Sequence, residues 1–384
     1  MARRARGLEL AVMAFAGFAG ILDTSFLIPI ISLYAIHLGA SGAVAGFIAG
    51  LYSMVAIPAS VVAGILVDRL GRKRMLFLGL LLDSISMLLY ALASSVTQLA
   101  LVRALHAIGG SLVFPAFLAR SREVSGERIG FGLGLMLAPV ALAIAIGSGF
   151  SGVTTALLGY RIPFIVIALV LGIASLLTLT LPPRPEERAW KGLKGIREGL
   201  AEAGSSVLAG LWVITMLYVA LGIIVGGLGA SLVKAGLMEE RTARLAMGVS
   251  VALSSFIAAV LFIINGIIAD RWGVALIVGY SSLVGLLGFL VASWNPGAPT
   301  IIAGVGVFGV SLSGLMLAST ILVSNAPPKA RGTAIGLQQV FNILGVAIGA
   351  PLGGILAGVG PEGVMLSAGL FTFLALAAVP YARS

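Results

Sequence analysis

Four ionisable side chains interrupt the long apolar runs in the first third of this chain: Asp23, Asp83, Arg103 and His106. A charge at the middle of a bilayer costs roughly 2.5 to 3.5 kcal/mol on insertion scales, so such residues usually face a cavity or a partner. Burial disfavours the charge of a carboxylate and a nearby guanidinium favours it, so changes in hydration can load and unload a proton. The chemistry open to this set is therefore reversible protonation, or a static buried ion pair that joins two helices.

Depth in the membrane indicates which of these groups can meet. Counting 1.5 Å per residue from the cytoplasmic end of each run places Asp23 and His106 about 20 Å deep and Arg103 about 24 Å deep. Arg103 and His106 share a helix face because they are three residues apart. Asp83 lies shallower, at about 12 Å. We therefore expect Asp23 to carry the proton, Arg103 to modulate its charge and His106 to lie near both.

Two amides in a late apolar run extend the candidate set. Gln338 and Asn342 are one helical turn apart, and the estimated depth of Asn342 is near that of Asp83. Such side chains line a cavity in some membrane proteins and join helices by hydrogen bonds in others. Both interpretations stay open for this pair.

The composition defines the class of protein that positions these residues. Hydrophobic residues make up 59% of the chain and the mean hydropathy is +1.13, which excludes a soluble globule and predicts a polytopic membrane protein. The formal charge of +10 comes from basic residues gathered in short loops, a pattern typical of membrane orientation and not of nucleic-acid binding. With no cysteine and two histidines, we expect no disulfide, no metal site and no cofactor.

Breaking the chain at charges, prolines and polar clusters predicts twelve membrane-spanning helices, with an uncleaved first span. They are 10–36, 42–66, 75–93, 98–119, 130–155, 161–181, 207–230, 243–268, 274–294, 299–324, 333–358 and 362–381. A cytoplasmic N-terminus puts 19 of the 24 Lys and Arg on cytoplasmic segments. The connection 182–206 is then cytoplasmic and divides the spans six and six, and its residues 190–200 have the pattern of an amphipathic helix at the headgroups or of a solvated linker helix.

An internal repeat relates the two halves. The stretch GILVDRLG at 64 recurs as GIIADRWG at 266, and Gly130 and Gly134 match Gly332 and Gly336 at the same offset of 202 residues. The sequence therefore predicts one six-span unit used twice in parallel, with domains 1–181 and 207–384. At this offset the four ionisable residues correspond to Val225, Gly285, Val305 and Phe308. The four ionisable residues inside the predicted spans therefore have no ionisable counterpart in the second half.

The repeated stretch resembles the signature of the major facilitator superfamily of secondary transporters, and most closely its 12-span drug/proton antiporters. The signature G-x-x-x-D-R-x-G-R-K is complete here as Gly64, Asp68, Arg69, Gly71, Arg72 and Lys73, with Asp270 and Arg271 as repeat mates. The resemblance implies an all-α fold of two pseudo-symmetric six-helix bundles that alternate between inward-open and outward-open states. It also places Asp68 beside the cytoplasmic start of span eleven, at 331–333, where free backbone N–H groups favour a carboxylate and the contact acts as a gate.

The same resemblance favours proton-coupled export of small amphipathic or lipophilic solutes. Span five matches the drug-antiporter pattern in part, with Ala138 before Pro139 and no paired glycines after it. The alternatives are a proton symporter or facilitator that takes up an organic acid or a sugar, and a transport-inactive receptor or assembly factor. No catalytic motif predicts an enzyme. We expect a monomer in the plasma membrane, with both termini cytoplasmic, whose partners are a small-molecule substrate, protons and lipid, without nucleic acid.

Overall fold

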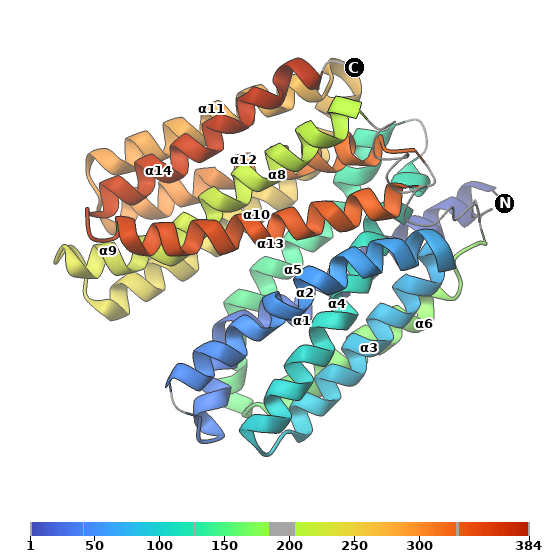
Figure 1. Cartoon of the computed structure of the whole chain (residues 1–384), viewed down its shortest axis with the longest axis horizontal. Helices are drawn as coiled ribbons and strands as arrows, with labels where there is room; N and C mark the ends of the chain where they lie inside the picture. Colours follow the sequence, from blue (N-terminus) through green and yellow to red (C-terminus); the bar gives the residue numbers. More distant parts are fainter. Residues whose placement is uncertain (1, 41, 126–127, 184–203, 328–329, 383–384) are drawn as a thin grey trace. The chain divides into compact units, whose positions relative to one another are not determined.

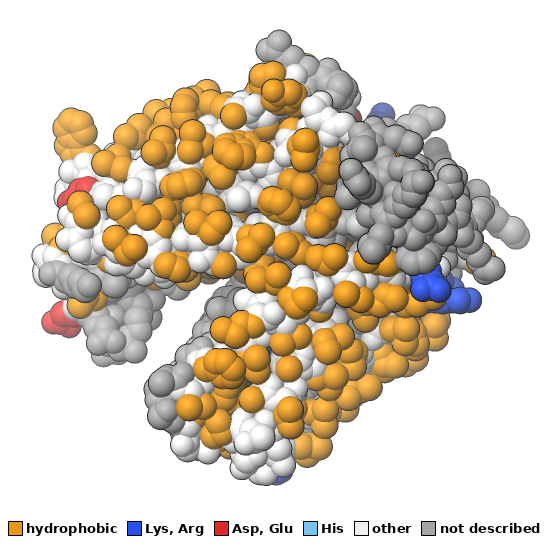
Figure 2. Space-filling view, in the orientation of Figure 1, with side chains coloured by type: hydrophobic (Ala, Val, Ile, Leu, Met, Phe, Trp, Pro, Cys, Tyr) orange, Lys and Arg blue, Asp and Glu red, His pale blue; other side chains and the backbone are white. Residues whose placement is uncertain are grey.

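The computed structural model describes residues 2–40, 42–125, 128–183, 204–327 and 330–382, and the described segments are helices joined by short turns (Figure 1). Twelve helical segments within these ranges are long and apolar enough to cross a membrane, which confirms the predicted number of spans. Figure 2 shows hydrophobic side chains over most of the visible face, with acidic and basic side chains near the helix ends. A surface of this kind suits contact with lipid.

The helices follow the predicted runs closely. Those of the first half are α1 (Ala2–His37), α2 (Gly42–Leu70), α3 (Arg72–Leu92), α4 (Val96–Ser125), α5 (Ile129–Leu158) and α6 (Arg161–Thr178). Those of the second half are α8 (Gly204–Ile223), α9 (Gly229–Lys234), α10 (Glu240–Trp272), α11 (Val274–Trp294), α12 (Ala298–Ser324), α13 (Arg331–Leu356) and α14 (Pro361–Leu374), which continues as a 3-10 helix over Ala375–Tyr381.

The seventh span differs from the uniform helix that the sequence predicts. A π-helical turn at Ile224–Leu228 separates α8 from α9. It contains Gly226 and Gly227, and a Cβ atom on Gly227 would lie 2.2 Å from the carbonyl oxygen of Gly353 on α13. These glycines therefore allow the backbone of α13 to approach the turn closely.

The described residues group into two compact units. Unit 1 comprises Met1–Val124, Pro139–Gly199 and Pro327–Val340, and unit 2 comprises Ser125–Ala138, Leu200–Ala326 and Phe341–Ser384. In unit 1, α3 packs along α6, and in unit 2, α12 packs against α10 and α11 (Figure 1). The proposed domain limits at 181 and 207 stay a prediction, and the amphipathic segment 190–200 lies outside the described residues.

The turns of the repeated motif have matching backbone conformations. Gly71 separates α2 from α3 at φ 98°, and Gly273 separates α10 from α11 at φ 86°. Residues other than glycine rarely adopt this left-handed region. The signature needs its glycine here because each helix pair reverses direction within a single residue.

Candidate functional site

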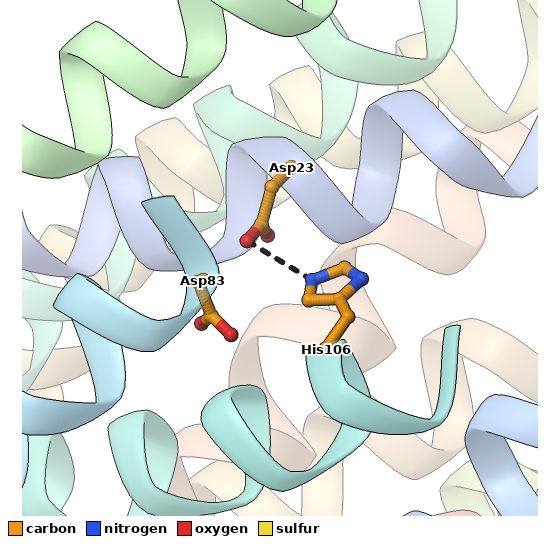
Figure 3. Close-up of side chains that lie close together, drawn as sticks. All are labelled: Asp23, Asp83 and His106. Carbon is orange, nitrogen blue, oxygen red and sulfur yellow. Dashed lines mark hydrogen bonds and ion pairs between the residues drawn. The ribbon is translucent and has the colours of Figure 1, made fainter. Parts of the chain in front are cut away.

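Three of the four predicted ionisable residues meet inside unit 1 (Figure 3). Asp23 on α1, Asp83 on α3 and His106 on α4 are each fully buried, and one ligand atom from each lies within 4.8 Å of those of the other two. The Nε2 atom of His106 lies 3.1 Å from Oδ2 of Asp23. A carboxylate and an imidazole at this distance share a proton or form an ion pair.

Aromatic side chains surround the imidazole. Tyr52 and Tyr90 each present an edge-on arrangement to His106, with ring centroids 5.2 and 5.9 Å away. The other carboxylate oxygen of Asp23 accepts a hydrogen bond from the backbone N–H of Thr24. These contacts fix the orientation of the Asp23–His106 pair and exclude water from it, which strengthens electrostatic interactions there.

Asp83 lies closer to the pair than the sequence estimate placed it. Neither of its carboxylate oxygens has a hydrogen-bond partner within the described part of the chain. It packs against Gly109 on α4, where a Cβ atom would lie 2.1 Å from Oδ1 of Asp83. The estimate counted from residue 75, whereas α3 begins at Arg72, which places Asp83 about 4.5 Å further along its helix. The starting points of the two counts were not at a common level.

Arg103 packs against the tyrosines that surround the His106 imidazole, and its role as a modulator of Asp23 stays a prediction. Its Cζ atom lies over the ring of Tyr52, 4.9 Å from the centroid, and the residue is 3% exposed. Its Nε and Nη1 atoms make no hydrogen bond to the described residues, and no described salt bridge reaches it. In this conformation Asp23 pairs with His106 and not with Arg103, whose charge is stabilised by an aromatic face.

The two predicted amides belong to different units. Gln338 is buried in unit 1, and Asn342 is partly buried in unit 2, where its side chain hydrogen-bonds to Tyr218. The bond to Tyr218 joins α13 to α8, which fits the helix-joining interpretation for Asn342.

Asp68 occupies the place that the signature implied. Its Oδ2 atom accepts hydrogen bonds from the backbone N–H of Thr333 at 2.8 Å and from the Thr333 hydroxyl at 2.7 Å. Thr333 is the third residue of α13, where backbone N–H groups have no partner within the helix. The carboxylate therefore caps α13 and meets the positive end of its dipole.

Unit 2 contains the repeat mate of this contact. Asp270 on α10 accepts hydrogen bonds from the backbone N–H groups of Gly130 and Phe131 on α5, at 2.7 and 2.9 Å. Phe131 and Thr333 are related by the offset of 202, as are Asp270 and Asp68. Both halves thus use the aspartate of the repeated motif to cap a helix of the other half of the sequence.

Close backbone contacts support each cap. A Cβ atom on Gly336 would lie 2.7 Å from the carbonyl oxygen of Ser60, and one on Gly134 would lie 2.1 Å from that of Phe262. These two contacts are also repeat mates. The paired glycines that revealed the repeat are therefore the residues that let α13 approach α2 and α5 approach α10.

The basic residues of the signature make specific contacts in unit 1. Arg72 forms a 2.6 Å ion pair with Glu123, and Lys73 donates to the carbonyl oxygens of Leu179 and Leu181 at the end of α6, at 2.8 and 2.6 Å. Of the others, Arg69 and Arg271 are exposed and Gly64 is buried in α2. Lys73 thereby neutralises the negative end of the α6 dipole.

Sequence reasoning missed a buried ion cluster next to these residues. Arg120 on α4 is 1% exposed and lies 2.8 Å from Glu9 on α1, while its guanidinium also donates to the carbonyl oxygen of Pro182 and lies 3.5 Å from Glu123. Burial, together with the neighbouring charges of Arg122 and Arg72, lowers the pKa of Arg331 at the start of α13. Helix spacing connects Arg120 to Glu123, three residues away, but no spacing rule connects Arg120 to Glu9, so only the fold reveals the whole cluster.

These features define a class of protein: a polytopic membrane protein built from a repeated six-helix unit, with a buried ionisable cluster in one half. A sequence profile of the Major Facilitator Superfamily matches residues 13–312 and 217–383. The chain belongs to this superfamily. Members of it transport small molecules across membranes, so the chain is a multi-pass membrane transporter.

Multidrug transporters are among its relatives. Multidrug resistance protein 1 of Bacillus subtilis is 25% identical over 362 residues, which cover 91% of this chain and 90% of that protein. Quinolone resistance protein NorA of Staphylococcus aureus is 23% identical over 193 residues, half of each chain. The similarity to the Bacillus protein extends over nearly the whole chain.

Solved structures agree on the fold. The human organic anion transporter MFSD10 (TETRAN) has a TM-score of 0.79 at 16% identity, covering 97% of this chain and 99% of that one. The transporter FucP in its outward conformation has a TM-score of 0.81 at 13% identity, covering 99% of this chain and all of that one. These similarities establish the superfamily fold of twelve helices in two six-helix bundles.

Proposed function

We propose that this transporter exports small amphipathic or lipophilic compounds in exchange for protons, by alternating access. The observation that carries the proposal is the fully buried Asp23–His106 pair with Asp83 beside it, because buried acids that gain and lose access to water are the minimum requirement for proton coupling. The names of its multidrug-resistance relatives support export of such compounds. The proposal assigns the protein no enzymatic activity.

The driving force is sufficient for this work. One charge that crosses a potential of 100 mV supplies about 2.3 kcal/mol, enough for roughly fiftyfold accumulation of a neutral solute. Val225, Gly285 and Phe308 replace the three ionisable residues in the second half, so we propose that the proton passes through the first half alone.

The experiment uses the protein reconstituted in vesicles with an imposed pH gradient and a fluorescent lipophilic compound chosen by a thermal-shift screen. Asp23→Asn should abolish transport driven by the gradient and leave counterflow exchange, which needs no net proton movement. Glu362→Gln provides a matched control, because it removes an exposed carboxylate at the start of α14. If Asp23→Asn still concentrates the compound against its gradient, the assignment to Asp23 fails and Asp83 is tested next.

Arg103 favours a second candidate, the proton-coupled or facilitated uptake of an organic acid. A buried guanidinium that lacks a carboxylate partner in this conformation can bind the carboxylate of a substrate in two parallel hydrogen bonds. Under this alternative, Arg103→Lys should abolish transport of organic acids, because lysine keeps the charge without the paired donors. If Arg103→Lys instead abolishes transport of lipophilic compounds and leaves transport of organic acids intact, the result favours export.

The proposed gate and the proposed domain arrangement are based on the internal repeat. We propose that Asp68 and Asp270 hold the cytoplasmic side closed through their helix caps, and that residues 182–206 join bundles 1–181 and 207–384 on the cytoplasmic side. We further propose a monomer in the plasma membrane with cytoplasmic termini. A purified chain that binds compounds and transports none would instead indicate a receptor or assembly factor.

A further inference from the structure

The buried cluster of unit 1 has the donor set of a cation site. Asp23, Asp83 and His106 come from three helices, and Figure 3 shows their carboxylate oxygens and imidazole nitrogen converging on a common space. Donors bound to a metal at about 2.1 Å lie roughly 3 to 4.2 Å apart. Since the three ligand atoms lie within 4.8 Å of one another, small side-chain rotations suffice to bring them to such a distance.

Asp83 is the observation that points to a ligand. It is fully buried, neither oxygen has a hydrogen-bond partner among the described residues, and its carboxylate lies beside the Asp23–His106 pair (Figure 3). Buried polar groups are nearly always paired, and a buried ionised carboxylate without a partner is costly. A bound cation or a bound proton removes this cost.

We propose that Asp23, Asp83 and His106 bind one divalent transition-metal cation, such as Mn²⁺, Co²⁺ or Zn²⁺. Two carboxylates and one imidazole suit these ions better than Mg²⁺, which prefers oxygen ligands in an octahedron, or Cu⁺, which prefers sulfur. The two positive charges of such a cation balance the negative charges of the two buried carboxylates. The sequence had led us to expect no metal site, because histidine is scarce.

The surroundings predict modest affinity. Metal-bound imidazoles usually donate their second N–H to an acceptor, whereas Nδ1 of His106 has no partner among the described residues. The titratable and charged groups that face the cluster from neighbouring helices are Tyr52 on α2, Tyr90 on α3 and Arg103 on α4. The positive charge of Arg103 also weakens cation binding.

The test is calorimetric titration of the full chain in detergent with MnCl₂, CoCl₂ and ZnCl₂ at pH 7.5 and 5.5, with Co²⁺ absorption as a second readout. We expect one saturable site per chain, with binding at least tenfold weaker at the lower pH. Asp83→Asn and His106→Gln should each weaken binding at least tenfold. Glu362→Gln, which changes an exposed acid, should leave it within twofold of the unaltered chain.

The proposal is overturned if the unaltered chain shows no saturable site, or if either folded variant binds as tightly as the unaltered chain. If Asp83→Asn fails to fold, the proposal is judged by metal binding to His106→Gln and by the pH dependence of binding to the unaltered chain. The outcome is separable from that of proton-coupled export, because vesicle transport is measured with EDTA present. Absence of a metal site with transport still dependent on Asp23 refutes only the cation proposal, and a metal site without pH-driven transport refutes only the export proposal.

Discussion

Replacement of Asp68 by asparagine removes the charge that caps α13 while keeping the shape of the side chain. The carboxylate accepts two hydrogen bonds from Thr333, at 2.8 and 2.7 Å. Hydrogen bonds to a charged acceptor contribute about 1.5 to 3 kcal/mol each, against about 1 kcal/mol for a neutral acceptor. Because the asparagine carbonyl still accepts and the site is partly exposed, we expect a net loss of about 1 to 2 kcal/mol.

The lost stabilisation destabilises only the cytoplasm-closed state, in which Asp68 caps α13. A change of 1.4 kcal/mol is a factor of ten, so Asp68→Asn should shift the ratio of cytoplasm-closed to cytoplasm-open molecules about five- to thirtyfold toward open. Thr333→Val removes the hydroxyl donor and keeps the backbone N–H, so it should produce a smaller shift in the same direction.

Spin labels at Leu70 and Trp272 report the change. The two residues are repeat mates, both are exposed, and each lies at the end of its helix beside the motif glycine. The chain has no cysteine, so labelling sites can be introduced without removing any. An unchanged distribution of distances between the labels in the Asp68→Asn protein, with folding intact, would refute the proposed gate.

Three further predictions follow from the same geometry. Asp270→Asn should shift the Leu70–Trp272 distances as Asp68→Asn does, and equal distances in the altered and unaltered proteins would count against a second gate. Gly109→Ala should displace the Asp83 carboxylate, because the added Cβ would lie 2.1 Å from its Oδ1 atom. The rate of pH-driven transport in the vesicle assay should then fall at least tenfold, and a normal rate would show that the position of Asp83 is unimportant. Glu9→Gln should destabilise the protein by about 3 kcal/mol, measured as a lower Tm, because it leaves Arg120 buried with a weaker partner, and an unchanged Tm would contradict this.

The sequence predicted the helices because they depend on local patterns, whereas the contact between Asp68 and the start of α13 was expected from the family resemblance. Hydrophobic length alone determines the spans, and the repeated motif fixes its glycine at a position that needs a positive φ. No local pattern predicted the π-helical turn at Ile224–Leu228, where the backbone of Gly353 from elsewhere in the chain packs closely against Gly227. Local information therefore predicts elements and their ends better than it predicts their irregularities.

The arrangement of the site was harder to predict because it depends on packing between helices. Depth counting brought Asp23 and His106 to one level, and these two residues do pair. It separated Asp83 from them because a shift of three residues at a helix end moves the estimate by about 4.5 Å. It also could not show that Tyr52 occupies the space beside Arg103, since aromatic contacts between helices have no sequence spacing.

Packing also explains why the ionisable cluster has no counterpart in the second half. At the position equivalent to Asp83, a side chain on Gly285 would meet Ser311, because a Cβ atom there would lie 2.3 Å from its hydroxyl oxygen. At the position equivalent to His106, Phe308 packs against Phe289 with ring centroids 5.5 Å apart. At the position equivalent to Asp23, Val225 lies in the π-helical turn and is 61% exposed. The two halves share their capping contacts, but the positions in the second half that correspond to the cluster leave no room for a buried cation or proton site, which agrees with our proposal that the first half alone carries that chemistry.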